Sequence, residues 1–295
     1  MTNGTVIKAI KLCFKASGRY PTAASLRCTA LAGPYVTLIT GASSGIGEAT
    51  ARRLAREPNF HLVLVARRDD KLNALASELG NATAVAADLT DPDAPRRIRD
   101  AIQAQHGALH MLVNNAGAAW RGTFAEAGWE NIERHMKLNF EAPVRLTEAL
   151  LPLLRRTARQ ADRVCVVNVA STAARVSRPN SGAYSASKFA LAAWSDALAG
   201  EELQNRIHVG LVLPGFVKTE GFPAAELTAK TLTRWIVSKP EVVAEAILQA
   251  GPGGKAERYA PRGYWLAAAA RILAPRLTRK ATAGGALTTK TGATS

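Results

Sequence analysis

The chain has few cysteines and no long apolar run, and each absence excludes a class of protein. Its 295 residues include three cysteines, Cys13, Cys28 and Cys165, with no CxxC pair and no histidine at metal-ligand spacing. This pattern argues against a disulfide framework and a zinc site, so we expect no metal and a reducing compartment, with a cytoplasmic location. Because no stretch of 18 apolar residues exists, we expect no transmembrane helix.

Acidic residues are missing or rare at both ends. Residues 1–47 carry five basic residues and no acid, and residues 251–295 carry +7 of the total charge of +15. The part between them is therefore close to neutral. Basic tails can bind nucleic acid, but we favour solvated tails on a metabolic enzyme and expect no nucleic-acid partner. Residues 1–33 resemble a targeting peptide, and a flexible extension or an overlong start is an equal alternative.

Aromatic residues are also scarce, at 6%, while Ala, Val and Leu dominate, as is typical of helices packed on a parallel sheet. Strand patterns occur at 36–40, 61–66, 82–87, 111–114, 163–170, 208–213 and 257–260. Helical patterns occur at 45–56, 69–79, 91–105, 129–155, 183–204 and 240–250, the fourth with a kink near Pro143 and Pro152. This alternation predicts an α/β fold, a Rossmann-type doubly wound parallel sheet with helices on both faces.

We expect one such domain over residues 34–262, between the basic extension 1–33 and a basic C-terminal helix and tail at 263–295. A glycine-rich segment joins its first strand to its first helix. Gly41 permits a tight turn, and Gly45 and Gly47 let the backbone approach a pyrophosphate at the helix N-terminus. The expected cofactor contacts in this segment are Gly41, Ser43, Ser44, Gly45, Ile46 and Gly47. The spacing is GxxxGxG rather than GxGxxG, and glycines after a strand can also simply form a turn.

The second strand ends in Ala66-Arg67-Arg68, where an NAD site would carry a carboxylate. A guanidinium can grip a 2′-phosphate through paired hydrogen bonds, so we predict NADP, contacted by Arg67 first and by Arg68 beside it. NAD is the alternative if both arginines are surface charges. Asp88 and Leu89 follow the third strand, where Asp88 either bonds the adenine or stabilises a turn.

A tyrosine and a lysine four positions apart, Tyr184 and Lys188, follow Ser171. On a helix this spacing puts both side chains on one face. The ammonium can then favour the phenolate and bring its pKa, about 10 in water, toward neutrality. A phenol that gives and takes a proton beside a dinucleotide site is suited to carbonyl reduction.

Five segments occur in order: 40–47, 114–117, Ser171, 184–188 and 214–219. Over about residues 35–260 the chain therefore resembles the short-chain dehydrogenase/reductase family in its compact single-domain form. The resemblance implies that Tyr184 exchanges a proton with the substrate and that Ser171 polarises the substrate oxygen. It implies that Lys188 lowers the pKa of Tyr184 and binds the nicotinamide ribose. Asn139, within Lys137-Leu-Asn-Phe, would hold a water that links Lys188 to solvent.

The resemblance also implies the remaining cofactor contacts. Asn115 would contact the adenosine ribose or support the sheet, beside the small residues Ala116 and Gly117. The carboxamide end of the nicotinamide would meet Pro214, Gly215, Val217 and Thr219. His110 departs from the acidic residue often found before the fourth strand, which we expect to change only a local contact.

A loop at 220–235 carries Phe222, Leu227, Leu232 and Trp235, which predicts an apolar lid and a lipophilic ketone, aldehyde or secondary alcohol as substrate. Trp120 and Phe124 line the pocket or pack in the core. The segment 264–277 has apolar residues at helical spacing and basic flanks. It either contacts a membrane surface peripherally or packs on the domain or a partner subunit. The resemblance implies a homodimer or homotetramer formed through the two long helices.

Together these features predict an NADP-preferring oxidoreductase that acts on a carbonyl/alcohol pair. The nearest enzymatic alternative is a reductase of 3-oxoacyl chains on an acidic carrier protein, which the basic ends could attract. An alternative of another class is a dinucleotide-binding scaffold or sensor without catalysis. The presence of Asn139, Ser171, Tyr184 and Lys188 together argues against that alternative.

Overall fold

The computed structural model describes residues 34–220 and 237–283. Three expectations from the sequence lie outside these residues: the extension at 1–33, the lid residues within 221–236 and the tail at 284–295. All the expected site residues lie inside them.

The core of the fold is a seven-stranded sheet whose paired strands all run parallel. The strands are β1 (Tyr35–Thr40), β2 (Phe60–Ala66), β3 (Ala82–Ala86), β4 (Met111–Asn114), β5 (Val164–Val169), β6 (Ile207–Pro214) and β9 (Glu257–Ala260). Their order is β3-β2-β1-β4-β5-β6-β9, so the direction of winding reverses between β1 and β4. The predicted doubly wound α/β fold is confirmed, and such a reversal opens a crevice at the carboxyl ends of the strands.

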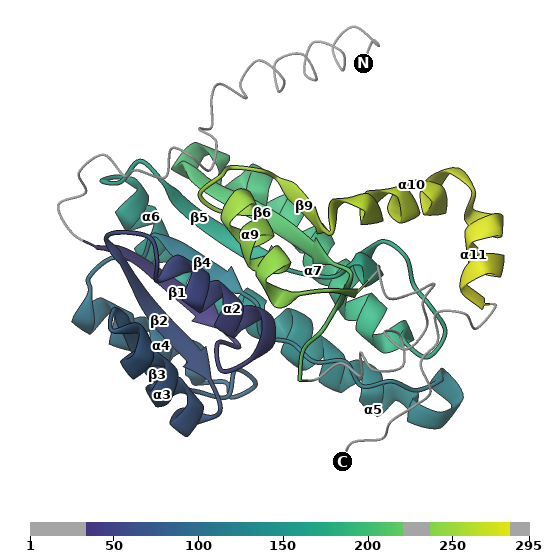
Figure 1. Ribbon diagram of the computed structural model, residues 1–295, viewed down its shortest axis with the longest axis horizontal. Coiled ribbons are helices and arrows are strands. Elements are labelled where there is room, and N and C mark those ends of the chain that lie inside the picture. Colours follow the sequence, from purple (N-terminus) through teal and green to yellow (C-terminus); the bar gives the residue numbers. More distant parts are fainter. Residues whose placement is uncertain (1–33, 221–236, 284–295) are drawn as a thin grey trace, which may run out of the picture.

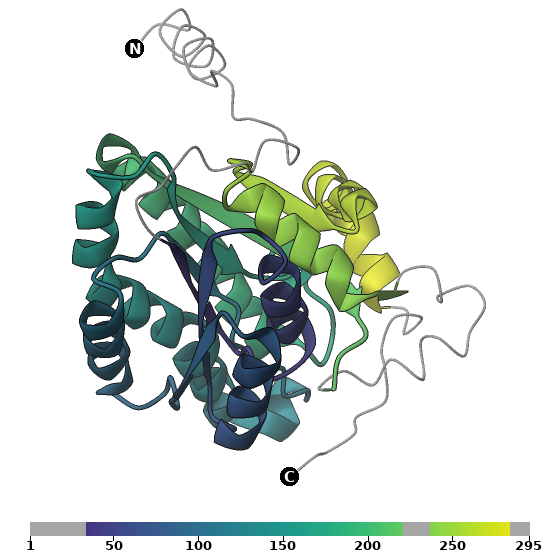
Figure 2. The same ribbon diagram turned by 60° about the vertical axis from the view of Figure 1, so that its left-hand side comes forward.

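Helices cover both faces of the sheet (Figure 1; Figure 2). One face packs against α2 (Gly45–Leu54), α3 (Asp69–Leu79) and α9 (Pro240–Ala250). The other packs against α4 (Ala94–Gln105), α6 (Ala142–Ala158) and α7 (Gly182–Glu201). Alternate residues of each strand face the two helical layers, which is why the strands read as continuous apolar runs.

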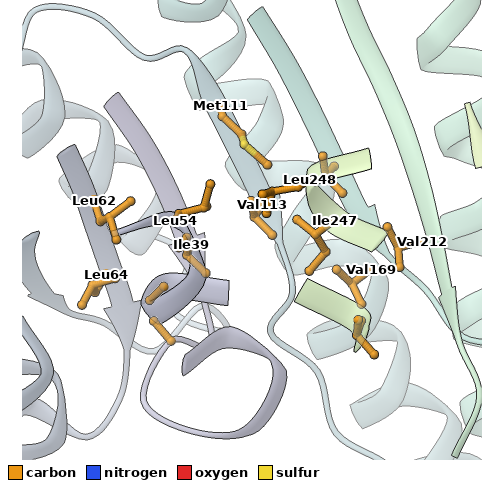
Figure 3. Close-up of a cluster of buried hydrophobic side chains, with 14 of the residues drawn as sticks. Ile39, Leu54, Leu62, Leu64, Met111, Val113, Val169, Val212, Ile247 and Leu248 are labelled. Atoms are coloured by element: carbon orange, nitrogen blue, oxygen red, sulfur yellow. The ribbon is translucent and has the colours of Figure 1, made fainter. Parts of the chain in front are cut away.

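The side chains of β1 illustrate this division. Ile39 belongs to the core layer beneath α2 and α9, whereas Leu38 belongs to the layer beneath α4 and α6. In Figure 3, Leu54 of α2 lies close to Ile39, and Ile247 of α9 lies beside Val113 of the neighbouring strand. All of these side chains are fully buried, and each such burial contributes about 1.5–3 kcal/mol.

The predicted helix at 129–155 is interrupted just before Pro143, close to one of the two expected kinks, and continues through Pro152, where the other was expected. The segment consists of α5 (Phe124–Met136), a π-helical turn (Lys137–Glu141) and α6. Helix α5 begins earlier than predicted because Thr123 and Glu126 form a capping box, and Gly128 interrupts it with a φ of 55°. The irregular turn precedes Pro143, and α6 continues through Pro152.

The C-terminal segment forms two helices, α10 (Trp265–Leu273) and α11 (Pro275–Ala283), where the sequence suggested one stripe at 264–277. Ala274 ends α10 with φ −134° and ψ 63°, because the residue before a proline is pushed out of the helical region. Among the described residues no helix is long and apolar enough to cross a membrane.

Two residues noted in the sequence have structural roles. The ring of His110 packs 4.8 Å from that of Tyr35, and its Nδ1 accepts a hydrogen bond from the Val36 amide at 3.1 Å. Cys165 is a buried free thiol in β5, and burial raises its pKa to about 12. His110 thus makes a local contact in the core, and the absence of a wider effect stays a prediction.

Candidate active site

A cleft of about 690 Å³ lies at the carboxyl ends of β1 to β4, around the reversal of strand order. Its volume is in the range of small-molecule and cofactor sites. The cleft brings together most of the cofactor contacts expected from the sequence. These are Gly41, Ser43, Ser44, Gly45, Ile46, Arg67, Arg68, Asp88, Leu89, Asn115, Ala116, Gly117 and Thr219.

The turn from β1 into α2 requires its glycines. Gly41 and Gly45 have φ of 66° and 57°, in the left-handed region. A Cβ on Gly47 would lie 2.2 Å from the carbonyl oxygen of Gly41. No side-chain hydrogen bond caps α2 at Ser44, so the first amides of this helix are available to an anion. The turn therefore fits the pyrophosphate of a dinucleotide.

The two arginines after β2 differ in environment. Arg68 donates hydrogen bonds to the Ser43 hydroxyl at 3.1 and 3.2 Å and to the Ser43 carbonyl oxygen at 3.2 Å. It also pairs with Glu220 at 3.1 Å. Arg67 is exposed at the edge of the cleft. Arg68 thus braces the glycine-rich turn, and Arg67 is the more accessible guanidinium.

Asp88 and Asn115 both hold the backbone around the cleft. Asp88 accepts hydrogen bonds from the amide and hydroxyl of Thr90 at 2.9 and 2.8 Å, so it stabilises a turn, as one reading of the sequence suggested. Burial alone would raise its pKa, but these bonds and the charge of Arg67 leave the pKa below its usual value. The amide of Asn115 donates to the Thr40 carbonyl at 2.8 Å, which ties β4 to β1 and supports the sheet.

Ser171 and Tyr184 meet beyond the cleft, where the Ser171 side chain lies within hydrogen-bonding reach of the Tyr184 phenol. Ser171 follows β5, where its Oγ accepts the Ala173 amide at 3.1 Å and caps a 3-10 turn. The same Oγ lies 3.4 Å from the Pro214 carbonyl oxygen. Ser171 therefore caps a turn and lies beside Tyr184 at the same time.

Lys188 and Asn139 converge on Gly117. A Cβ on Gly117 would lie 2.9 Å from Asn139 Oδ1 and 3.3 Å from Lys188 Nζ. The ammonium of Lys188 donates to the Val169 carbonyl at 2.9 Å. The amide of Asn139, on the π-helical turn, bonds both the N–H and the carbonyl of Ala118 at 2.9 Å. The four expected catalytic residues thus surround the end of β4 and the end of β5.

The pKa of Tyr184 is raised, which corrects the expected direction. Burial of the phenol is the main cause, and the Ser171 hydrogen bond and the charges of Arg178 and Arg121 oppose it. The ammonium of Lys188 does not contribute to the pKa of Tyr184. Burial lowers the pKa of Lys188 itself to about 8. The spacing of four residues predicted a stabilising ammonium, but Lys188 is directed to the Val169 carbonyl.

Sequence reasoning missed the two arginines and a histidine near the phenol. Arg178 has its Cζ 4.6 Å from the centre of the Phe216 ring, and burial and Arg121 lower its pKa. His135 is fully buried with its ring centre 6.1 Å from that of Tyr184. Only the tertiary fold brings these residues together, and no motif at their own positions marks them.

His135 is held as a neutral imidazole. Its Nε2 accepts the Trp120 amide at 3.0 Å, so its Nδ1 carries the proton toward the Asn131 carbonyl at 2.6 Å. Burial, the leading cause, lowers its pKa. Trp120 lines the cleft, as one reading of the sequence suggested, and packs edge-on against His135 at 4.9 Å. Phe124 instead is 74% exposed and borders a separate cavity of about 370 Å³.

The segment after β6 closes the site from the other side. Thr219 packs on Gly45, where an added Cβ would come within 3.0 Å of its methyl group. Gly215 meets the ring of Tyr264, two carbons of which would lie 2.4 Å from an added Cβ. Val217 is buried in the short strand β7 (Phe216–Val217). In the described part of the chain, no group of His, Cys, Asp or Glu side chains is arranged to hold a metal.

The fold and this glycine-lined cleft define a Rossmann-type nucleotide-binding protein. The family model described as short chain dehydrogenase matches residues 35–229. The chain therefore belongs to the short-chain dehydrogenase family. A solved short-chain dehydrogenase from Streptomyces avermitilis superposes with a TM-score of 0.71 at 27% identity, covering 83% of this chain and 95% of that one.

Relatives with given functions are moderately similar. The chain is 35% identical to dehydrogenase/reductase SDR family member 7B of Bos taurus, covering 66% of this chain and 61% of that protein. It is 34% identical to 3-ketodihydrosphingosine reductase of Bacteroides thetaiotaomicron, covering 63% and 65%. It is 33% identical to the ketoacyl reductase HetN of Nostoc sp., covering 75% and 76%. The chain thus spans about three fifths to three quarters of these relatives.

Proposed function

We propose that this protein is an NADP-preferring oxidoreductase that interconverts a carbonyl and a secondary alcohol, with Tyr184 as general acid and base. The observation that carries the proposal is the approach of the Ser171 side chain to the Tyr184 phenol beside a cleft that fits a dinucleotide. The nicotinamide, when bound, supplies or takes the hydride. The chain itself has to bind the substrate oxygen and move one proton.

The raised pKa of Tyr184 suits proton donation. A phenol whose pKa lies above its usual value stays protonated at neutral pH and can give its proton to a carbonyl oxygen during reduction. Ser171 would hydrogen-bond the same oxygen as negative charge develops on it. Lys188 and Asn139 lie together at Gly117 and would resupply the proton from solvent through a water held by Asn139.

The end of β2 supports NADP. Two arginines stand there, and Asp88, a neighbouring acid in the cleft, is engaged by Thr90. Arg68 braces Ser43, which leaves the exposed Arg67 to contact a 2′-phosphate. Asp88 and Leu89 would contact the adenine side. Pro214, Gly215, Val217 and Thr219 would contact the carboxamide side.

A lipophilic substrate fits the names of the relatives. One is a 3-ketodihydrosphingosine reductase, and others are a ketoacyl reductase and a fatty acyl-CoA reductase. The ketoacyl reductase among them also supports the second candidate, reduction of 3-oxoacyl chains, which we extend to chains on a carrier. Turnover of acyl-carrier substrates without turnover of free ketones would favour that candidate.

A homodimer or homotetramer also belongs to the proposal. Helices α5 and α7 present large apolar side chains to solvent, with Trp129 69% and Phe189 41% exposed. Light scattering of the purified protein should give two or four times the chain mass of 31.3 kDa. A Trp129→Ser/Phe189→Ser variant should dissociate, and an unchanged mass would exclude this interface.

The test of the cofactor site is fluorescence titration with NADPH and NADH. We expect NADPH to bind more tightly than NADH. The Arg67→Ala variant should bind NADPH about tenfold or more weakly, because a hydrogen bond to a charged group is lost. Arg96→Ala, an exposed arginine on α4, is the control and should bind like the natural chain. Equal or tighter binding of NADH would refute the NADP preference. Binding of neither would refute the nicotinamide-cofactor site itself.

A further inference from the structure

Helices α10 and α11 expose a group of large apolar side chains that the cleft does not use. We call this group, together with the basic residues of α11, the C-terminal surface. Its apolar members are Trp265, Leu266, Ile272, Leu273 and Leu277, which are 52%, 58%, 76%, 83% and 69% exposed. Half of the large apolar side chains exposed in the described residues are thus concentrated within thirteen consecutive positions.

The apolar side chains of α10 share one face of the helix. Two adjacent pairs, Trp265-Leu266 and Ile272-Leu273, lie seven residues apart, which is about two helical turns. Ala268, on the adjoining side, is buried. Helix α10 therefore rests on its small residues and points its large ones away from the protein, and Figure 1 shows α10 and α11 extending beyond the sheet.

The charge of this surface has one sign. No acidic residue occurs from Pro261 to the end of the sequence. Arg276, Arg279 and Lys280 are exposed on α11, on either side of Leu277. An apolar face beside a basic cluster is complementary to a surface with hydrocarbon below and negative charge above.

We propose that the C-terminal surface binds an anionic lipid bilayer. Helix α10 lies in the interface with Trp265, Leu266, Ile272 and Leu273 in the acyl region, and the basic side chains of α11 meet the lipid headgroups. A second copy of the chain is a poorer occupant, because a two-fold contact here would bring two identical basic clusters together.

The position of the surface connects it with the cleft. Tyr264, directly before α10, packs against Gly215 and is hydrogen-bonded to the Phe216 backbone. A bilayer bound at α10 therefore lies next to the segment after β6, which closes one side of the site. The docking does not depend on the proposed reaction, so it can fail or hold independently of it.

The test is co-sedimentation of the full chain with vesicles of phosphatidylcholine alone or mixed with an equal part of phosphatidylglycerol. Two double variants remove each component: Ile272→Ser/Leu273→Ser and Arg276→Glu/Arg279→Glu. The matched controls are Leu203→Ser, 75% exposed elsewhere, and Arg96→Glu on α4. All four positions of the double variants are exposed, so folding should be retained, which a thermal melt verifies.

We expect binding to the mixed vesicles, and binding by both double variants weaker by about tenfold or more, since each basic residue near such a surface contributes roughly fivefold. The controls should bind like the natural chain. Equal binding to both vesicle types, no binding, or unchanged binding by the double variants would overturn the proposal, the last by assigning binding to other residues such as 1–33. A change in oligomeric state of the variants without lipid would assign the surface to a second copy.

Discussion

At the phenol of Tyr184, burial and positive charge act in opposite directions. Burial raises the pKa, while the Ser171 hydrogen bond and the charges of Arg178 and Arg121 lower it. Because the sum is a raised pKa, the protonated form persists to higher pH than for a free tyrosine. Alcohol oxidation, which needs the phenolate, should therefore speed up as the pH rises.

Removing a charge tests this balance. We expect Arg178→Met to raise the pKa of Tyr184 further, so that the rise of alcohol oxidation with pH shifts to more alkaline values. The control is Arg134→Met, because Arg134 stacks on Trp120 at 4.6 Å and is not among the groups that act on the phenol. Equal shifts in both variants, or none in Arg178→Met, would contradict this account of the phenol.

Lys188 adds a second titration. Its pKa is lowered by burial to about 8, so its ammonium form is lost as the pH rises past that value. If the ammonium resupplies the proton, kcat/KM for carbonyl reduction should fall above about pH 8. A profile of kcat/KM that stays level to pH values well above this would separate Lys188 from proton transfer.

Gly215 is a residue whose lack of a side chain has a specific reason. A Cβ there would lie 2.4 Å from the Tyr264 ring, so we expect Gly215→Ala to lower the free energy of unfolding by about 1–3 kcal/mol. The same change in a Tyr264→Ala background should cost much less. Gly200, in α7, has nothing within 4 Å, so Gly200→Ala should stabilise by about 0.5–1 kcal/mol. Equal losses from Gly215→Ala in both backgrounds, measured in urea, would rule out the clash.

At the scale of elements, a buried carboxylate links two helices. The side chain of Glu202, just after α7, is 1% exposed and binds Arg155 of α6 through both oxygens. It also accepts from Asn205 at 3.0 Å. We expect Glu202→Gln to cost about 1–3 kcal/mol of unfolding free energy, because a buried charged hydrogen bond is lost.

The matched change is Asp93→Asn in the exposed pair with Arg96, whose side chains are 64% and 61% exposed. It should cost less than about 0.5 kcal/mol. Urea denaturation of both variants gives the comparison. A similar small loss for Glu202→Gln would mean that solvent compensates for the buried pair.

Elements with a regular period and clear ends could be predicted from the sequence. The bounds of α3, β4, α9 and β9 are as predicted, because turn residues or glycines flank a short apolar pattern. The division of the segment 124–158 could not be predicted in this way. Its π-helical turn lies where Asn139 bonds Ala118 and Ser187, which are distant in the sequence. Local periodicity does not contain such a contact.

The same distinction applies to the site. The glycine turn and the set of Ser171, Tyr184 and Lys188 are recognisable because their spacing is local or ordered along the chain. The direction of the Tyr184 pKa and the involvement of Arg178 depend on burial and on distant segments. Sequence therefore predicts which groups are present, and the fold determines their electrostatics.

For the whole molecule, the histidines predict how stability depends on pH. All five, His61, His106, His110, His135 and His208, have pKa values lowered by burial. The unfolded chain then binds more protons than the folded one below about pH 6.5, so stability falls as the pH decreases. We expect the melting temperature to drop between about pH 7.5 and 5.5. A melting temperature that is constant or rises over this interval would contradict the burial of these rings.

The most direct test of the central claim is turnover by Tyr184→Phe, measured as NADPH consumption with a panel of lipophilic ketones. NADPH binding is titrated on the same preparation. We predict binding like that of the natural chain and a fall in turnover of about a hundredfold or more, the value of a positioned proton donor. Turnover equal to that of the natural chain would show that the phenol does not transfer the proton, and the proposed reaction would then need another acid.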